Sequence, residues 1–380
     1  MDFSWSPQQI ELYDTIGDFA ARELNDNLVD KDRRGVFNRS GFKRCGEVGI
    51  LGLPVPVEYG GLACDPLTTV GALERLGYAC RDNGLVFSLN AQIWTATMPI
   101  VAFGTEEQKR KYLPGLCSGD MVGGTAMTEP GSGSDAYALR ATAVKKGDRY
   151  VLNGSKVFVT NGPVADVLVV FARTDKDKSA AGISAFLVDR WTPGLTIGQR
   201  LEKMGLRTSP TCELSIDDCE VPEGSRLGRE GAGPALLTHA MTWERGSILA
   251  SAVGSMQRLL ETCVKYAKSR RQSGRPIGQF QLVASRVVDM KLRLETARYM
   301  LYYGAWQRAL GRAAILEAAM AKLHISESWV RSCEDAIQIH GGYGYTTDFE
   351  IERELRDAIG SRLYSGTSEI QRMIVASLML

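Results

Sequence analysis

The pattern of apolar and polar positions changes twice along the chain, and the first segment has helical periodicity. Ser6-Pro7 predicts a helix cap followed by a first-turn proline. Apolar side chains then recur on one face of this helix: Ile10, Tyr13, Ile16, Phe19 and Ala20. The stretches "LTTVGALERLGYACR" and "TEEQKRKYLPGL" repeat the pattern, with Thr105 capping the second. The first segment is therefore predicted to be a set of packed helices.

Strand-like patterning takes over from about Met121. "RYVLNGSKVFVTN" has β-branched and aromatic residues on both sides of Asn153-Gly154, a dipeptide typical of hairpin turns. "VLVVFART", "ISAFLVD" and "CELSIDDCEVP" follow as strand-like runs separated by turn residues. This pattern predicts a small antiparallel β-barrel or sandwich.

Helical periodicity returns after "GREGAGP" and continues to the end of the chain. Three long amphipathic stretches and a shorter terminal one predict a four-helix bundle. The fold class expected from these changes is α+β and multidomain. The expected domains are an N-terminal helical domain (1–119), a middle β domain (120–228) and a C-terminal four-helix domain (229–380).

Composition narrows the possible functions without naming one. The 380 residues are 44% hydrophobic and 23% charged, with a formal net charge of +1, which leaves no basic surplus for binding nucleic acid. The N-terminus lacks the features of a secretory signal, and no apolar run approaches the ~20 residues that span a bilayer. A cytoplasmic protein that binds neither membrane nor nucleic acid is expected.

Cysteine and histidine usage bears on redox and metal chemistry. Eight cysteines are scattered without CxxC pairs, so reduced and mostly buried thiols are predicted. Only three histidines occur, at 239, 324 and 340, and their spacing is not that of metal ligands. We therefore expect chemistry that does not use a protein-bound metal.

Two polar stretches in the middle of the chain are candidates for ligand binding. In "TAMTEPGSGSDA", Gly131 and Gly133 allow close approach of a ligand, while Thr128 and Ser134 offer hydroxyls. An ordinary polar loop is the alternative. In "FVTNG", Phe158 and Thr160 could face a planar ring, or could simply pack across the strands.

Two stretches in the C-terminal segment suggest an anion site. "YAKSRRQSGRPIGQFQ" puts Arg270 and Arg271 before a Gly-Pro break, where an arginine suits a diphosphate. A solvated basic loop is the alternative. "QIHGGYGY" ends a helix in two glycines, which cap the helix and could also bring the backbone close to an anionic ligand.

Taken together and in this order, the motifs resemble those of the acyl-CoA dehydrogenase family. The resemblance rests on "MTEPGSGSD", "FVTNG", "RxxxGRPIxxFQ", "QIHGGYGY" and "GTSEIQ", and it covers nearly the whole chain. It implies the three-domain fold described above, a homotetramer or dimer, and FAD bound at a subunit interface.

The resemblance also assigns residues to FAD. They are Thr125, Ala126, Met127, Thr128, Gly133, Ser134, Phe158, Val159, Thr160, Arg270, Gln281, Gln338, Gly341, Gly342, Thr367, Ser368 and Glu369. Residues 158–160 are expected against the isoalloxazine ring, and Arg270 and Gln281 near the diphosphate and adenosine. "QIHGG" is expected to reach across from the neighbouring subunit. Ser273 stands where the family often has Phe, so this edge of the pocket is expected to differ.

The family's reaction removes an α-proton from an acyl thioester while the β-hydrogen leaves as hydride to the flavin, and it needs a carboxylate base. Most members carry that base immediately before the glycine of "SGTSEIQ", where this chain has Ser365. A minority resembling isovaleryl-CoA dehydrogenase carry it on another helix, and the matching residue here is Glu244 in "MTWERG". A solvated Glu-Arg pair is the alternative reading of that dipeptide. The resemblance assigns substrate contacts to Ser134, Arg245, Ser365 and Gly366.

The acyl group and its carrier stay open at this stage. "WERG" together with "YSGTSEIQ" resembles dehydrogenases of prolyl or other aminoacyl groups on peptidyl carrier proteins, and a short- or branched-chain acyl-CoA is the alternative. Trp94 could shorten the acyl cavity or pack in the core. An electron-transfer flavoprotein or oxygen is expected to accept the electrons. A flavin monooxygenase and a non-catalytic scaffold on the same fold are rival hypotheses.

Overall fold

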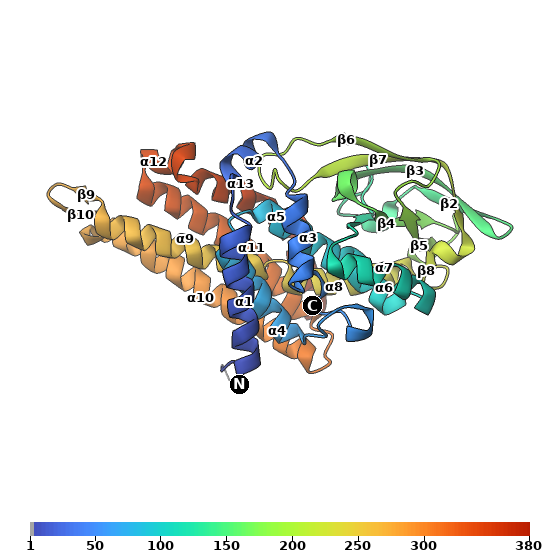
Figure 1. Ribbon diagram of the computed structural model, residues 1–380, viewed down its shortest axis with the longest axis horizontal. Helices are drawn as coiled ribbons and strands as arrows, with labels where there is room; N and C mark the ends of the chain where they lie inside the picture. The colour runs from blue at the N-terminus through green and yellow to red at the C-terminus, as the bar shows by residue number, and fades with distance from the viewer. Residues whose placement is uncertain (1–3) are drawn as a thin grey trace.

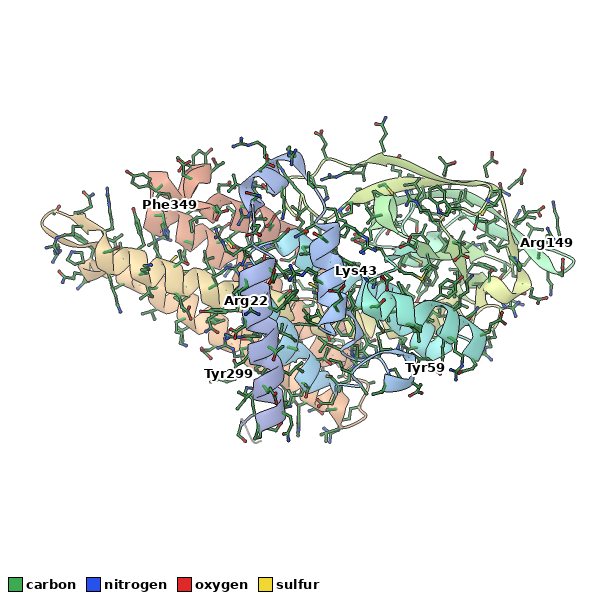
Figure 2. The ribbon with its side chains drawn as sticks, viewed as in Figure 1. Arg22, Lys43, Tyr59, Arg149, Tyr299 and Phe349 are labelled. Atoms are coloured by element: carbon green, nitrogen blue, oxygen red, sulfur yellow. The ribbon has the colours of Figure 1, made fainter. Side chains whose placement is uncertain are left out.

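A computed structural model describes residues 4–380 and has the expected order of helices, sheet and helices (Figure 1). The sheet forms one end of the molecule, and the long C-terminal helices extend to the other end. Arg149, the first residue of strand β3, and Phe349, close to helix α12, lie near these two ends (Figure 2).

The N-terminal part is helical, as predicted. Its first helix begins with a capping box, in which the Ser6 hydroxyl accepts from the backbone N–H of Gln9 and the Gln9 side chain accepts in return. Thr105 and Gln108 cap α7 in the same way. The helices are α1 (Pro7–Glu23), α2 (Leu28–Arg34), α3 (Arg39–Glu47), α4 (Pro66–Ala79), α5 (Asn83–Ala91), the π-helical η3 (Gln92–Thr97), α6 (Met98–Phe103) and α7 (Glu106–Ser118).

The middle part is a mostly antiparallel sheet in the order β6-β7-β3-β2-β4-β5-β8, with β1 running parallel to β4. Strands β4 and β5 are buried on both faces, since one face packs against helices and the other lies inside the folded sheet. The strands are β1 (Gly123–Ala126), β2 (Thr142–Lys146), β3 (Arg149–Thr160), β4 (Val167–Arg173), β5 (Ile183–Asp189), β6 (Leu195–Arg200), β7 (Thr211–Pro222) and β8 (Arg226–Leu227).

The predicted hairpin at Asn153-Gly154 is wrong. Strand β3 runs through this dipeptide without turning, and the chain reverses earlier, between Lys146 and Arg149. Gly154 instead marks a shift in the pairing of β3 with β7, and its φ of 149° brings the backbone against Ala141. A bulge therefore uses the glycine that the sequence suggested for a turn.

The C-terminal part is a bundle of long helices, as predicted. Helix α11 contacts α8, α9, α10, α13 and α14, so it lies at the centre of the bundle. A short hairpin of β9 (Arg271–Gln272) and β10 (Arg275–Pro276) separates α9 from α10. The helices are α8 (Gly233–Ser247), α9 (Ala250–Ser269), α10 (Gln281–Ala309), α11 (Ile315–His340), α12 (Gly342–Tyr345), α13 (Ile351–Gly360) and α14 (Ser368–Met379).

Two further expectations can be compared with the structure. All eight cysteines are free, and all but the half-buried Cys64 are buried, which confirms the expected reduced thiols. The expectation that no apolar run nears membrane length is wrong, because the helical stretch Asn83–Phe103 has 21 residues and a mean hydropathy of 1.3. In the most apolar 18-residue segment of this stretch, 78% is buried within the fold, as in a core helix.

Candidate functional site

Glu244 lies in the last turn of α8 and is buried, with 6% of its surface exposed. Its Oε1 accepts a hydrogen bond of 2.7 Å from the hydroxyl of Ser365. Its Oε2 is also buried but has no hydrogen-bond partner among the described residues. One oxygen is thus held in place while the other is free to accept a proton. This excludes the alternative of a solvated Glu-Arg pair.

The surroundings of Glu244 change its proton affinity in two directions. Burial raises the pKa of this carboxyl and is the dominant effect. The hydrogen bond from Ser365 and the charges of Arg245 and Lys322 lower it in part. The net pKa of Glu244 is raised, although the positive charges of Arg245 and Lys322 still act on its carboxylate. Such a carboxylate suits a general base near neutral pH.

Ser365 and Gly366 form a tight turn beside Glu244, and both have left-handed backbone conformations, with φ of 58° and 88°. The Ser365 carbonyl accepts from Nε of Arg245 at 3.2 Å and from Nε2 of Gln371 at 3.1 Å. Because the C=O and N–H of one peptide point in opposite directions, the Gly366 N–H faces away from these donors. The turn therefore has a side that is fixed by the protein and a side that can face a ligand.

Sequence reasoning missed two buried residues that hold this turn. Gln371 donates to the Gly366 carbonyl at 3.0 Å, and Lys322 of α11 donates to the same carbonyl at 2.7 Å. Lys322 is fully buried. Its signal in the sequence is a lone lysine among the alanines of "AAMAKLH", on the buried face of a predicted helix.

An aromatic pair lies next to Glu244. Trp243 stacks on Trp94 with ring centroids 5.7 Å apart and planes 6° apart, and the Arg308 guanidinium lies 4.0 Å above the Trp243 ring. Trp94 is fully buried and donates from Nε1 to Asn90. The structure therefore favours a core-packing role for Trp94, supporting the wall behind the base.

The loop after β1 is fixed at its ends and open in its middle. Lys156 is buried, and its Nζ donates to the Met127 carbonyl at 3.2 Å and pairs with Glu129 at 2.7 Å. Burial raises the pKa of Glu129, but the bonds from Lys156 and from two backbone N–H groups outweigh it, and the net pKa is lowered. Around Gly131 and Gly133 no atom lies within 4 Å of the space a side chain would take. The open part of the loop can thus approach a ligand.

Of the residues predicted to face a flavin ring, Phe158 is unusually exposed. Phe158 is 68% exposed and has a φ of 57°, although it follows the buried Val157 and precedes the buried Val159. Asn161, also left-handed at φ 64°, holds the end of β3 through bonds to the carbonyls of Ser88 and Gly123. A large exposed aromatic in a strained conformation indicates a surface that a ligand covers.

Arg270 and the "QIHGG" segment lie together in one chain. A cavity of about 530 Å³ is lined by Arg270, Gln338, Gly341, Gly342 and neighbouring residues. Nothing lies within 4 Å of the side-chain positions of the two glycines. The sequence interpretation assigned only "QIHGG" to a neighbouring subunit, whereas the structure groups Arg270 with it. Gln281, the exposed first residue of α10, does not line this cavity.

The hydroxyls of Thr367 and Ser368 in "GTSEIQ" form hydrogen bonds within the protein. Thr367 caps α14 by accepting from the N–H of Ile370, and Ser368 donates to Glu327 at 2.7 Å. Glu369 is exposed. Thr367 and Ser368 therefore shape the start of α14, and the exposed Glu369 carboxylate is itself hydrogen-bonded to Thr367.

Two groups of the residues predicted for FAD lie in different parts of the molecule, and neither includes Gln281 or residues 367–369. One group consists of the loop 125–134 and residues 158–160, at the junction of sheet and helices, and Thr125 donates there to the Thr95 carbonyl at 2.6 Å. The other group lines the Arg270 cavity, close to the β9–β10 hairpin and α12, at the end of the molecule opposite the sheet (Figure 1). Open glycine backbone, a cationic arginine and an exposed aromatic fit the parts of a dinucleotide.

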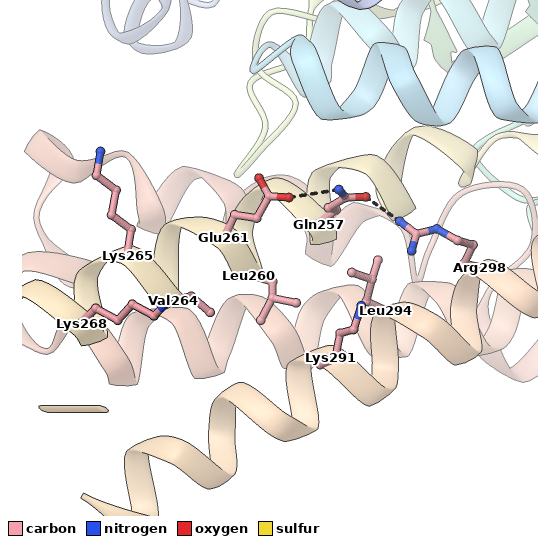
Figure 3. Close-up of a pocket in the computed structure, with 9 residues that line it drawn as sticks. All are labelled: Gln257, Leu260, Glu261, Val264, Lys265, Lys268, Lys291, Leu294 and Arg298. Atoms are coloured by element: carbon pink, nitrogen blue, oxygen red, sulfur yellow. Dashed lines mark hydrogen bonds between the residues drawn. The ribbon is translucent and has the colours of Figure 1, made fainter. Parts of the chain in front are cut away.

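A second open cavity, of about 520 Å³, lies between α9 and α10 (Figure 3). Its lining includes Lys265, Lys268 and Lys291, together with Glu261 and Arg298. Glu261 already accepts from Gln257 and Tyr78, and Lys291 pairs with Glu295. None of the predicted site residues lines this cavity, so it is not part of the candidate site.

Comparison with known families identifies the three parts of the chain. Residues 6–120 match the model for the acyl-CoA dehydrogenase N-terminal domain. Residues 124–219 match the middle domain, and residues 231–380 match the C-terminal domain.

The chain is similar over its full length to characterised relatives. It is 41% identical to the L-prolyl-[peptidyl-carrier protein] dehydrogenase of Serratia sp., over 99% of this chain and 97% of the relative. It is 40% identical to the human mitochondrial short-chain specific acyl-CoA dehydrogenase, over 97% and 89% of the two chains. A solved structure of the prolyl acyl carrier protein oxidase AnaB has 51% identity and a TM-score of 0.98, covering 99% of this chain and 100% of that one. A structure of PigA with FAD and proline has 40% identity and a TM-score of 0.98, covering 100% and 99%.

Proposed function

Because this chain belongs to the acyl-CoA dehydrogenase family, we propose that it oxidises the Cα–Cβ bond of an acyl thioester with FAD as its cofactor. Bound FAD supplies the acceptor for the β-hydrogen, which leaves as hydride with two electrons. The observation that carries this proposal is the buried Glu244, with one oxygen bonded to Ser365 and the other free.

In this proposal Glu244 takes the α-proton of the thioester, and the electrons of that C–H bond form the new double bond. The Ser365–Gly366 turn offers backbone N–H groups to the thioester carbonyl, where negative charge develops. Arg245 is half-buried next to the base and is proposed to bind the pantetheine arm. Its bond to the Ser365 carbonyl ties this contact to the geometry of the turn.

The proposed flavin residues fit a site shared by two copies of the chain. The loop 125–134 and residues 158–160 of one copy would hold the ring, next to that copy's Glu244. Arg270 and residues 338–342 of a second copy would hold the diphosphate and adenosine. The separation of these groups within one chain supports the shared arrangement. The full assembly is proposed to be a homodimer or homotetramer.

For the substrate we propose a carrier-protein-tethered aminoacyl group such as prolyl. The support is the full-length similarity to a prolyl-carrier-protein dehydrogenase and to a prolyl acyl carrier protein oxidase. A short- or branched-chain acyl-CoA is the second candidate, supported by the similarity to a short-chain specific enzyme. The electron acceptor is proposed to be oxygen or an electron-transfer flavoprotein. Air reoxidation of the substrate-reduced protein distinguishes the two, since rapid reoxidation supports oxygen.

The test compares wild type with Glu244→Gln for FAD content and for anaerobic bleaching of the flavin band. The probes are a carrier-loaded prolyl thioester and a short-chain acyl-CoA. We expect Glu244→Gln to retain FAD and lose bleaching by at least a hundredfold, the scale of general-base catalysis. Glu74→Gln is the control, because Glu74 is also buried but pairs with Arg298 elsewhere in the fold. Unchanged bleaching in Glu244→Gln contradicts the assignment, and a wild type that reacts with neither probe contradicts both substrates.

A further inference from the structure

Lys322 is a fully buried lysine in the middle of α11, a helix whose neighbouring buried residues are mainly small and apolar. Its ammonium donates 2.7 Å to the Gly366 carbonyl and lies 5.9 Å from the ring centroid of Tyr364. Among residues 4–380 no carboxylate lies within the 4.0 Å of an ion pair with it. Burying an ammonium in this way is costly unless its charge is used by a nearby anion.

The anion that opposes this cost most strongly is Glu244. Burial lowers the pKa of Lys322 to about 8, and the Glu244 charge is the largest influence in the opposite direction. Reciprocally, the Lys322 charge lowers the pKa of Glu244. The two side chains come from different helices, α11 and α8, and meet at the Ser365–Gly366 turn.

The other charged groups around this pair are already engaged or act on one member only. Arg245 faces Glu244 from the same helix and donates to the Ser365 carbonyl. Glu327 acts on Lys322 but pairs with Arg362 at 2.7 Å. Two further groups also bear on the pair: Tyr364, which faces Glu244, and the exposed Glu369, which acts on Lys322.

We propose that Lys322 is a positioning residue for the base, because its buried ammonium places a positive charge at the turn that holds Glu244 and its hydrogen bond fixes that Ser365–Gly366 turn. The inference deepens the proposed function and rests on it. Gln371 provides a natural comparison, since it donates to the same Gly366 carbonyl but carries no charge. The charge and the hydrogen bond of Lys322 can therefore be tested separately.

The experiment compares wild type, Lys322→Met, Lys322→Gln and Gln371→Met as FAD-loaded proteins. Lys322→Met removes charge and hydrogen bond, Lys322→Gln keeps a neutral donor, and Gln371→Met removes a neutral donor alone. The first readout is the pH dependence of anaerobic flavin reduction by the thioester that wild type oxidises. The second is the infrared band of the protonated Glu244 carboxyl, identified by its absence in Glu244→Gln, followed as a function of pH in resting protein.

In both Lys322 variants we expect the acidic limb of flavin reduction and the infrared titration to move to higher pH. In Gln371→Met we expect slower flavin reduction. The acidic limb of its pH profile and its infrared titration should lie at the same pH as in wild type. The inference is overturned if the Lys322 variants titrate like wild type, or if Gln371→Met shifts the curves equally. Should Lys322→Met fail to fold, Lys322→Gln decides alone. A wild type inactive with every thioester refutes the proposed function, while the infrared titration still tests the coupling.

Discussion

The hydroxyl of Ser365 donates a 2.7 Å hydrogen bond to Oε1 of Glu244, across 121 residues of sequence. The serine stands where the family resemblance places the base of most members, and it now contacts the carboxylate that we assign to that role. The two positions are therefore adjacent in space, and a carboxylate from either could reach the same ligand. In this chain Ser365, the residue before Gly366, supports the carboxylate of Glu244 through its hydrogen bond.

Ser365→Ala is expected to slow flavin reduction about tenfold below neutral pH while FAD is retained. The variant loses a hydrogen bond to a charged group, which contributes roughly 1.5 kcal/mol, and this bond lowers the pKa of Glu244. The acidic limb of the pH profile should therefore move to higher pH. The backbone cost of the left-handed φ is the same for Ser and Ala. Ser365→Gly is the control for backbone strain. Its rate of flavin reduction should fall by the same factor as in Ser365→Ala, while its stability should rise. A wild-type rate and profile in Ser365→Ala would contradict the role of the hydroxyl.

Relative to wild type, Glu244→Gln is expected to gain stability as pH rises from acidic to neutral values. Burial raises the pKa of Glu244, so the folded protein holds this proton more tightly than the unfolded chain. The corresponding stability is complete below about pH 4.3, the pKa of an unfolded glutamate, and is lost as pH rises through the folded value. Glutamine at position 244 stays neutral. The free energy of unfolding of the variant relative to wild type should therefore grow as pH rises from about 4.3 through the folded pKa of Glu244. Urea unfolding at several pH values measures it.

Glu354→Gln is the matched control for this pH effect, because Glu354 has the same 6% exposure. Burial raises its pKa, but the charges of Arg258 and Arg353 outweigh burial and the net pKa is lowered. Removing that charge breaks a buried pair and should destabilise the protein at neutral pH by roughly 3 kcal/mol or more. Equal effects of the two substitutions would show that Glu244 has no raised pKa.

Local sequence signals predicted most of the fold, because helices and strands depend on periodicity that short windows contain. The caps at Ser6 and Thr105 and the long amphipathic helices were confirmed. The hairpin at Asn153-Gly154 was wrong, because β7 pairs along nearly the whole of β3 and holds it extended. Tertiary pairing overrode a turn preference there, and the same glycine served a bulge.

The site was less predictable, because its contacts join residues distant in sequence. Glu244 was identified from the resemblance, and its burial could not be read from a Glu-Arg dipeptide. Lys322 and Gln371 come from two other helices and meet the Ser365–Gly366 turn only in the folded chain. No short pattern links these positions, although a lone lysine on an apolar helix face was a usable signal.

Phe158→Gly is expected to weaken FAD binding at least tenfold and to leave the apoprotein as stable as wild type or up to about 1 kcal/mol more stable. The exposed ring contributes little packing, and glycine accepts the φ of 57° without the steric cost of a side chain. Asn27→Gly, at φ 51° in an exposed position just before α2, is the control and should leave FAD affinity unchanged. Thermal unfolding without FAD and fluorescence titration with FAD measure the two effects. A large loss of apoprotein stability would show that Phe158 is a packing residue.

Mixed assemblies of two inactive variants are expected to regain activity, because the proposed flavin site takes its two groups of residues from two copies of the chain. Glu244→Gln removes the base and leaves the Arg270 cavity intact, whereas Arg270→Glu repels the diphosphate and leaves the base intact. In a mixed pair, one shared site combines the intact Glu244 of one copy with the intact Arg270 of the other, and that site should bind FAD and oxidise the thioester. The second site carries both defects and should be inactive. Co-expression with two different affinity tags and tandem purification isolates the mixed species, which is compared with each variant alone. If Arg270 served the flavin of its own chain, every site in the mixture would carry one defect and no activity would return.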